Sequence, residues 1–249
     1  YTADRWLTNR GSNVTGITVS RSTSVPAGFQ YSLALQRTAA NATTNTMNIY
    51  NSNESVNTLD LAGQSVTLSF WAKAGANYSG GALSIFVNSG TGTDERVYAF
   101  TGSSSVVNTT QAITTTWTRY TFTGSVPSNS TELGFYISWT PSGTAGADDT
   151  VYFTGFQLEA GTTATPFEVR SYGTELQLCQ RYYINYGTGF HYDLPQVSTY
   201  YTTRRRVAAF IAQPMRTTPT ATYTLGSDGG YTGDVFSISN NINWDVYAI

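Results

Sequence analysis

The sequence predicts an all-β protein, and three features of its composition support that prediction. Thr, Tyr, Phe and Val, which favour pleated strands, are abundant, and aromatic residues make up 14% of the 249 residues. Gly, Asn and Ser, which favour turns, take the place of the Ala, Glu, Lys and Leu that helical bundles need in bulk. Only 11% of the residues are charged, so the chain lacks the high charge and low aromatic content of a disordered protein.

Alternation of apolar and polar residues defines the strands of the first part of the chain. In the segment 66–73, one face carries Val66, Leu68, Phe70 and Ala72, and we expect that face to meet the core. The segment 83–88 likewise places Leu83, Ile85 and Val87 on one face, with Phe86 opposite. Further strands are expected at 13–19, 30–35, 46–51, 117–123, 133–139 and 151–158. About eight strands, separated by turn-rich segments such as 102–105, predict a two-sheet jelly roll over residues 1–160.

The rest of the chain divides into a connecting segment and a smaller β-rich region. The segment 159–166 contains small polar residues, a Gly and a Pro, which indicate a domain edge. Tyr172, Leu176, Cys179 and Tyr183 are spaced as one apolar stripe of a short helix. Strand patterns return at 204–213, 220–225, 234–239 and 243–248. We therefore expect a linker with a short helix at 161–183 and a small β-rich assembly domain at 184–249.

The net charge and the rarity of two residue types exclude several functions. A formal net charge of −2 argues against electrostatic binding of nucleic acid or of anionic lipid. No segment approaches the roughly 20 apolar residues of a membrane-spanning helix, so we expect no membrane insertion. The single cysteine excludes an intrachain disulfide, and the single histidine, His191, excludes a multi-histidine metal site. The chain begins at Tyr1 without a methionine, and we expect it to be processed or trimmed.

Several segments resemble parts of a known family. The segments 1–6, 61–73 and 153–161 look like the carbohydrate-binding-module-like jelly roll that is widespread in bacteriophage structural and tail-fibre proteins. The segments 164–170 and 173–183 carry a more specific likeness. They are similar to a junction that recurs in phage tail-fibre and virion appendage proteins. In those proteins a β-rich segment with a Pro-Met-Arg-x-x-Pro stretch follows, and here that stretch is 214–219.

The resemblance implies a non-enzymatic structural or adhesive appendage at the surface of an extracellular phage particle. Such appendages are oligomers, often trimers, that assemble with other virion proteins and contact polysaccharide of the host cell surface. We accordingly predict a homotrimer that displays its jelly roll toward host glycans. Two other functions stay open: a carbohydrate-binding module of a secreted polysaccharide-degrading enzyme, and a purely architectural virion protein without a ligand.

Aromatic rings bind sugars by stacking on the apolar side of the pyranose ring, and amide and hydroxyl groups frame them. The residues that alternate with the expected core residues lie on the outer faces of the strands. The candidate carbohydrate-binding residues are Trp71, Lys73, Phe86 and Tyr136, with Asn88 as an amide partner. The alternative is that a loop, the linker or a neighbouring domain covers these side chains. Trp6 is interpreted as a packing anchor.

A second set of residues suits contacts between subunits. Arg204, Arg205 and Arg206 form the one local run of positive charge. They either contact anionic polysaccharide or a neighbouring subunit, or keep a sheet edge soluble. Tyrosines are large and amphipathic, and two pairs of them are further interface candidates. These pairs are Tyr182 with Tyr183 and Tyr200 with Tyr201.

No residues form a recognisable catalytic or metal-binding motif. The chain has 15 Asp and Glu residues, but no pair stands in a glycosidase motif, so we expect no enzyme activity and no catalytic residue. Asp148 and Asp149 have the oxygen ligands that calcium prefers. Similar jelly rolls often hold a structural calcium through an Asp early in the last strand, where Thr154 and Gly155 stand here. We therefore expect no cofactor and no metal, and interpret Asp148 and Asp149 as a solvated turn.

Overall fold

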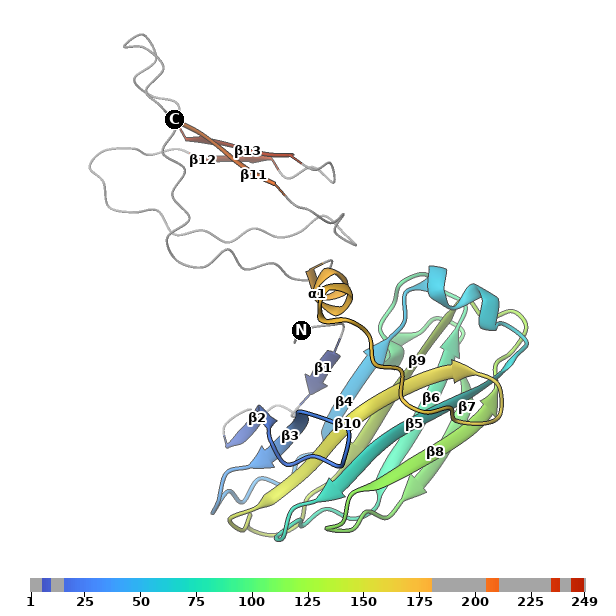
Figure 1. Cartoon of the computed structure of the whole chain (residues 1–249), viewed down its shortest axis with the longest axis vertical. Coiled ribbons are helices and arrows are strands. Elements are labelled where there is room, and N and C mark those ends of the chain that lie inside the picture. The colour runs from blue at the N-terminus through green and yellow to red at the C-terminus, as the bar shows by residue number, and fades with distance from the viewer. Residues whose placement is uncertain (1–5, 10–15, 181–204, 211–233, 238–242, 249) are drawn as a thin grey trace. The chain divides into compact units, whose positions relative to one another are not determined.

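The computed structural model describes residues 6–9, 16–180, 205–210, 234–237 and 243–248. The chain divides into two compact units, Tyr1–Val169 and Arg170–Ile249 (Figure 1). Each unit is described by itself. Across the described residues, no helix has the length and apolar character needed to cross a bilayer.

The first unit is a sandwich of two five-stranded sheets in which all neighbouring strands are antiparallel. Sheet A has the order β1 (Trp6–Asn9), β4 (Met47–Ser52), β9 (Glu132–Trp139), β6 (Leu83–Gly90) and β7 (Ser104–Gln111). Sheet B has the order β2 (Ile17–Ser22), β3 (Ser32–Arg37), β10 (Asp149–Ala160), β5 (Ser65–Ala74) and β8 (Thr118–Ser125). Three 3-10 turns, η1 (Ser55–Asn57), η2 (Leu59–Leu61) and η3 (Val97–Ala99), lie in the connections. The predicted jelly-roll sandwich is confirmed.

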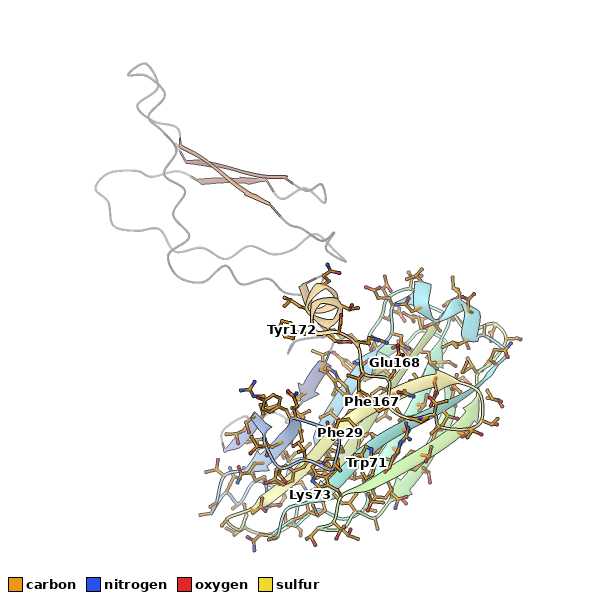
Figure 2. The ribbon with its side chains drawn as sticks, viewed as in Figure 1. Phe29, Trp71, Lys73, Phe167, Glu168 and Tyr172 are labelled. Carbon is orange, nitrogen blue, oxygen red and sulfur yellow. The ribbon has the colours of Figure 1, made fainter. Side chains whose placement is uncertain are left out.

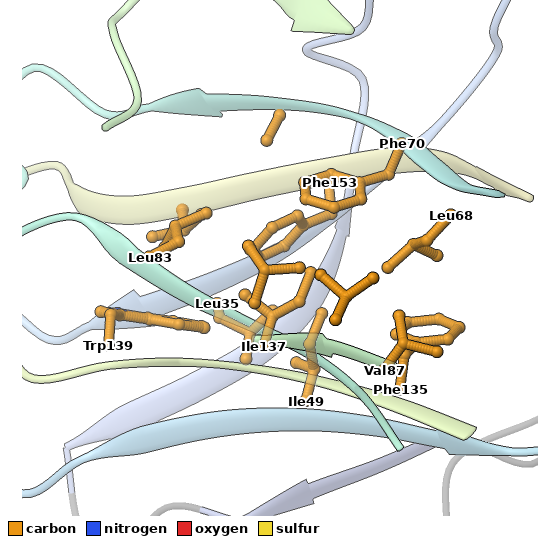
Figure 3. Close-up of a cluster of buried hydrophobic side chains, with 14 of the residues drawn as sticks. Leu35, Ile49, Leu68, Phe70, Leu83, Val87, Phe135, Ile137, Trp139 and Phe153 are labelled. Carbon is orange, nitrogen blue, oxygen red and sulfur yellow. The ribbon is translucent and has the colours of Figure 1, made fainter. Parts of the chain in front are cut away.

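The core lies between the two sheets (Figure 3). The predicted core face of β5, namely Val66, Leu68, Phe70 and Ala72, is buried, and so is the predicted core face of β6, namely Leu83, Ile85 and Val87. Phe70 of sheet B makes ring contacts with Phe153 and Phe156 of β10. Trp6 contacts Phe135 at 5.5 Å and Phe156 at 4.7 Å between ring centroids, which confirms its role as a packing anchor.

The structure adds two strands to the eight that the sequence predicts. Strand β1 has only the four residues Trp6–Asn9, too few for an alternating pattern to be recognised. Strand β7 consists of Ser, Thr, Asn and Gln around two valines, and the segment 102–105 was predicted to be a turn, yet Ser104 and Ser105 begin this strand. Both lie at edges of sheet A, where one side of the strand needs no partner.

Strand β3 continues two residues beyond its predicted end, to Arg37, which pairs in register with Ile17 of β2 and with Asp149 of β10 and forms a buried ion pair. Arg37 is 1% exposed, and its guanidinium lies 2.8 Å from Asp149 Oδ2 at the start of β10. The same guanidinium donates hydrogen bonds to the carbonyl oxygens of Thr43, Ser142 and Gly143. A buried charge is tolerated only when it is paired and hydrogen-bonded in this way.

The second unit contains the predicted short helix and a small sheet. Helix α1 is Tyr172–Gln180, and the Ser171 hydroxyl accepts a hydrogen bond from the Thr174 N–H at its N-terminus. Tyr172 and Leu176 of the predicted stripe are both exposed. Strands β11 (Arg205–Phe210), β13 (Asn243–Ala248) and β12 (Asp234–Ser237) form an antiparallel sheet in this order. The predicted smaller β-rich region is thus confirmed, while the strand expected at 220–225 lies outside the described residues.

Candidate functional site

A row of aromatic side chains crosses the outer face of sheet A. Tyr50 of β4, Tyr136 of β9 and Phe86 of β6 are direct register partners on three adjacent strands. We call these three residues the aromatic row. The rings of Phe86 and Tyr136 stack with centroids 4.3 Å apart and planes 15° apart, and Tyr50 lies 5.8 Å from Tyr136. Phe86 and Tyr136 are half-buried, so the row offers apolar surface at the outside of the sheet.

Amide and hydroxyl side chains flank the aromatic row on both sides. Toward one end of the strands lie the register partners Asn48, Ser138, Ser84 and Thr110. Toward the other end lie Ser52, Gly134 and Asn88. Stacking occupies one face of the Phe86 ring, and the other face is turned along the row toward β7, where the exposed Asn108 is the register partner of Phe86. Among the described strand residues on this face, Glu132 is the one carboxyl group, none is Lys or Arg, and Glu132 is buried.

The connection between β6 and β7 forms a wall at one end of the aromatic row. In this wall loop, residues 91–101, Val97 donates its N–H to Ser52 Oγ at 2.9 Å. Val97 and Phe100 form a small buried cluster with Tyr50. Tyr98 lies 5.2 Å from Tyr50 between ring centroids and is 52% exposed, so it extends the row outward.

Two carboxyl groups fasten the wall loop to the sheet. Glu132, the first residue of β9, accepts a hydrogen bond from the Glu95 N–H. Glu95 in turn accepts hydrogen bonds from the N–H of Thr101 at 2.5 Å and from its hydroxyl at 2.8 Å. Asp94 has a left-handed φ of 56° and is tied to Ser55, the first residue of η1. Its carboxylate accepts the Ser55 N–H, and its own N–H donates to the Ser55 hydroxyl. The loop therefore has a fixed path from β6 over sheet A to β7.

The outer face of sheet B is covered by the chain itself. Residues 161–168, which follow β10 and which we call the strap, run over β5, β8 and β10. Thr67 Oγ1 donates to the Gly161 carbonyl at 2.8 Å, and Arg119 Nη2 donates to the Thr165 carbonyl at 2.5 Å. Gln157 holds the strap at two points, through Thr165 Oγ1 and the Glu168 N–H. The first residues of the predicted linker, 161–168, thus pack on the outer face of sheet B.

Trp71 belongs to a packed cluster on this face. Its ring and that of Phe29 lie over Gly155, where β10 bulges with a φ of 62°, and a Cβ on Gly155 would lie 2.6 Å from Phe29 Cζ. Phe29 in turn contacts Phe167 of the strap at 5.2 Å between ring centroids. Figure 2 shows Phe29, Trp71 and Phe167 on the same side of the sandwich. Trp71 therefore meets the loop before β3 and, through Phe29, the strap.

Lys73 is engaged with two aromatic rings of its own face. Its ammonium lies 4.8 Å from the ring centre of Tyr152 and 5.8 Å from that of Trp117. The Tyr152 hydroxyl donates to Asp148 Oδ1 at 3.1 Å. Burial alone would raise the pKa of Asp148, but hydrogen bonds from Ala76, Thr150 and Tyr152, together with the Lys73 charge, hold it below its ordinary value.

The five predicted carbohydrate-binding residues therefore fall on opposite faces of the sandwich. Phe86, Asn88 and Tyr136 lie together on sheet A, whereas Trp71 and Lys73 lie on sheet B. Three further residues of this surface, Tyr50, Tyr98 and Asn108, were not predicted from the sequence. Alternation with Met47 and Ile49 places Tyr50 on the outer face and could have identified it. Asn108 required the recognition of β7, and Tyr98 lies in a loop that only the fold brings to the row.

Most of the predicted subunit-interface residues lie outside the described residues. This holds for Tyr182, Tyr183, Tyr200, Tyr201 and Arg204, and also for His191. Arg205 and Arg206 are the first residues of β11, where they pair in register with Ala248 and Tyr247 of β13.

The interpretation of Asp149 as part of a solvated turn is wrong. Asp149 is 4% exposed, and besides the Arg37 guanidinium its carboxylate accepts the N–H and hydroxyl of Ser79 at 2.9 and 2.7 Å. Asp148 is half-buried and accepts the Ala76 N–H at 2.9 Å. An arginine of the chain itself thus supplies the positive charge beside Asp149. The described residues contain no group of three or more His, Cys, Asp and Glu side chains that could hold a metal ion.

No family model and no curated protein matches the chain. Among solved structures, the CBM22-1 xylan-binding domain from Paenibacillus barcinonensis is 16% identical with a TM-score of 0.41, over 64% of this chain and 87% of that one. A CBM4 structure is 17% identical with a TM-score of 0.39, over 64% and 88%. The enzymatically active domain of tailspike protein 4 from bacteriophage CBA120 is 17% identical with a TM-score of 0.40, over 63% and 19%. These likenesses concern fold alone.

Proposed function

We propose that the outer face of sheet A binds a neutral polysaccharide, and that the chain uses this surface for adhesion without catalysing a reaction. The observation that carries the proposal is the aromatic row, Tyr50–Tyr136–Phe86, in register across three strands with amide and hydroxyl side chains on both sides. Apolar rings and neutral hydrogen-bonding groups are the two features with which proteins bind sugars.

The chemistry of the surface favours a neutral ligand. Tyr, Phe, Asn, Ser and Thr make up the row and its flanks, and the buried Glu132 is the one Asp, Glu, Lys or Arg side chain among the described strand residues of this face. An anionic polysaccharide would call for Lys or Arg on these strands. The exposed Arg96 is in the wall loop, where it donates to the Tyr98 hydroxyl. Asn108 and Asn88 are placed to hydrogen-bond the hydroxyls of a sugar that lies against Phe86.

We further propose that the chain is a virion appendage that acts as a homo-oligomer, with its second unit mediating assembly. The sequence junction at 164–183 and the following β-rich region support this placement. Weak sugar contacts become useful for adhesion when several copies engage one surface, so a trimer would suit such a site.

Binding to a panel of neutral and anionic polysaccharides tests the proposed surface. We expect the neutral members to bind, and Phe86→Ala to weaken that binding about tenfold, because an aromatic contact contributes about 1 kcal/mol beyond its buried area. Phe167→Ala, which removes a similar ring from the strap on the opposite face, is the matched control and should bind like the wild type. Unchanged binding by both Phe86→Ala and Tyr136→Ala would rule out this surface.

Two measurements test the proposed assembly and location. Size-exclusion chromatography with light scattering should report an oligomer, and a monomer at working concentration would contradict the appendage proposal. Imaging of the phage particle, with the chain labelled, should then place it at the particle surface.

A further inference from the structure

The carboxyl groups of Glu132 and Glu95 lie side by side where the wall loop meets sheet A. Glu132 is fully buried, and its Oε2 has no hydrogen-bond donor among the described residues. A Cβ added to Gly92 would lie 2.9 Å from Glu132 Oε2 and closer still to Glu95 Oε2, so both oxygens face the same point of the backbone. A Cβ on Gly90 would lie 3.1 Å from the same Glu132 oxygen. The two glycines leave room for the carboxyl pair.

The surroundings of the pair shift the pKa values of the two carboxyls in opposite directions. The N–H and hydroxyl of Thr101 hold the pKa of Glu95 below its ordinary value. Burial raises the pKa of Glu132, and the negative charges of Glu95 and Asp94 add to the rise, while the Glu95 N–H offsets only part of it. Adjacent carboxyls favour the sharing of one proton, because two negative charges at contact distance repel each other.

The charged groups near Glu132 come from the wall loop. Asp94 and Glu95 are the two that act on it. Arg96, the next residue, is exposed, and its Nη1 donates to the Tyr98 hydroxyl at 2.8 Å. Glu132 therefore has one carboxyl group beside it, that of Glu95.

The wall loop connects the carboxyl pair to the aromatic row. Glu95 is two residues from Val97, whose side chain packs on Tyr50 and whose N–H is held by Ser52. Tyr98 and Phe100 follow, and both contact Tyr50 or its cluster. If the pair separates, the segment that carries Val97, Tyr98 and Phe100 loses its attachment to β9.

We propose that Glu132 is a positioning residue for the glycan surface: as a neutral carboxylic acid it donates a hydrogen bond to the Glu95 carboxylate and so holds the wall loop against the aromatic row. Loss of the proton turns this contact into a repulsion and releases the loop. The effect on glycan affinity rests on the proposed function, whereas the position of the loop does not.

The sign of the pH dependence follows from the direction of the shift. A carboxyl whose pKa is raised by folding stabilises the folded state below its unfolded pKa, and this contribution is lost as the pH rises through the folded value. The loop should therefore be held at low pH and released as the pH rises through the raised pKa of Glu132.

Tryptic cleavage after Arg96 in the full chain measures the position of the loop without any glycan. We expect the cleavage rate, normalised to a peptide that spans Arg96, to rise about tenfold as the pH rises through the raised pKa of Glu132. Glu132→Gln should stay protected throughout, because its amide donates a hydrogen bond to Glu95 at any pH. Glu159→Gln, in contact with the strap, is the matched control and should keep the wild-type profile. Identical profiles for the wild type and Glu132→Gln would overturn the proposal.

The same variants separate this proposal from two others. Affinity for a neutral polysaccharide should fall with rising pH in the wild type and stay constant in Glu132→Gln. If no polysaccharide binds but the cleavage profiles differ as expected, the proposed function fails and the role of Glu132 stands. If added calcium protects the wild type at alkaline pH and Glu132→Gln is cleaved at every pH, the pair holds a cation, and the role of the proton is refuted.

Discussion

The two outer faces of the sandwich both carry aromatic side chains, but the chain covers only one of them. On sheet B, Trp71 meets Phe29, which contacts Phe167 of the strap, and Lys73 lies over the rings of Tyr152 and Trp117. On sheet A, Phe86 and Tyr136 stack on each other and stay half-exposed beside amides and hydroxyls. A half-buried aromatic residue of this fold therefore either packs under another segment of the chain or lies on an open surface. The segments that precede or follow the strands decide which of the two applies.

We expect substitutions on the covered face to change mainly the free energy of unfolding, and substitutions on the open face to change mainly the affinity for glycan. Removal of a ring from the covered face should cost free energy of unfolding, because its neighbours lose a packing partner. Removal of a ring from the open face should cost less stability and more affinity. The following changes test this separation, from the largest expected effect to the smallest.

Trp71→Ala should destabilise the first unit by about 2 kcal/mol, less than a fully buried tryptophan would, and leave glycan affinity unchanged. Denaturation in urea measures the free energy of unfolding. Tyr31→Ala, which removes a 46% exposed ring near the same face, is the control and should change stability by less than about 0.5 kcal/mol. A Trp71→Ala protein of normal stability that no longer bound glycan would show that sheet B is the binding face.

Gly134→Ala should disturb the open face, because its Cβ would lie 2.8 Å from the Asn51 carbonyl oxygen and 2.9 Å from Val97 Cβ. Overpacking of this kind costs about 1–2 kcal/mol, and the displaced wall loop should weaken glycan binding as well. Gly81→Ala is the control, since nothing lies within 4 Å of the added methyl group. If Gly134→Ala kept full affinity, the wall loop would have no part in binding.

Arg119→Met should loosen the strap, because Arg119 Nη2 donates to both Ser69 Oγ at 2.9 Å and the Thr165 carbonyl at 2.5 Å. The loss should be about 1 kcal/mol, with faster amide hydrogen exchange in residues 161–168 and no change in glycan affinity. Arg21→Met, which removes a cation–π contact with Tyr31 away from the strap, should leave exchange in the strap unchanged. Altered glycan binding in Arg119→Met would mean that the two faces are coupled.

The smallest effect should be an opposite response of the two faces to pH. The lowered pKa of Asp148 on sheet B gives stability that is present above the unfolded pKa and is lost as the pH falls through the folded value. Asp148→Asn should therefore flatten the acidic limb of the stability profile, measured by denaturation at a series of pH values. Asp60→Asn, a change at an exposed carboxylate in η2, is the matched control. The Glu132 pair on sheet A should instead lose its contribution as the pH rises through the raised pKa of Glu132, and a loss with falling pH for both groups would contradict the comparison.

Local patterns in the sequence predicted the strands that form the core. Val66, Leu68 and Phe70 alternate with polar residues and are buried as expected, because a strand turns every second side chain to the same face. The same pattern could not reveal β7, whose outer residues are Ser, Thr and Asn, since an edge strand is defined by its hydrogen bonds to β6 rather than by an apolar face.

The candidate site was only partly predictable. The alternation placed Phe86, Asn88 and Tyr136 outside the core, and the structure brings them together. It also placed Trp71 and Lys73 outside, but contacts with Phe29, Tyr152 and Trp117 engage them on the other sheet. The burial of Asp149 was missed because its partner, Arg37, is 112 residues away in the sequence.

The low charge and high aromatic content of the sequence by themselves determined an all-β sandwich, because strand and turn preferences depend on neighbouring residues. Which strands became neighbours, and therefore which outer residues share a face, was decided only by the tertiary structure. The register of β4, β9 and β6 assembles the aromatic row. Hydrogen bonds between residues far apart in the chain hold the strap on sheet B and the wall loop on sheet A. Such long-range contacts leave no periodic signal in the sequence, which is why one aromatic face could not be told from the other before the fold was known.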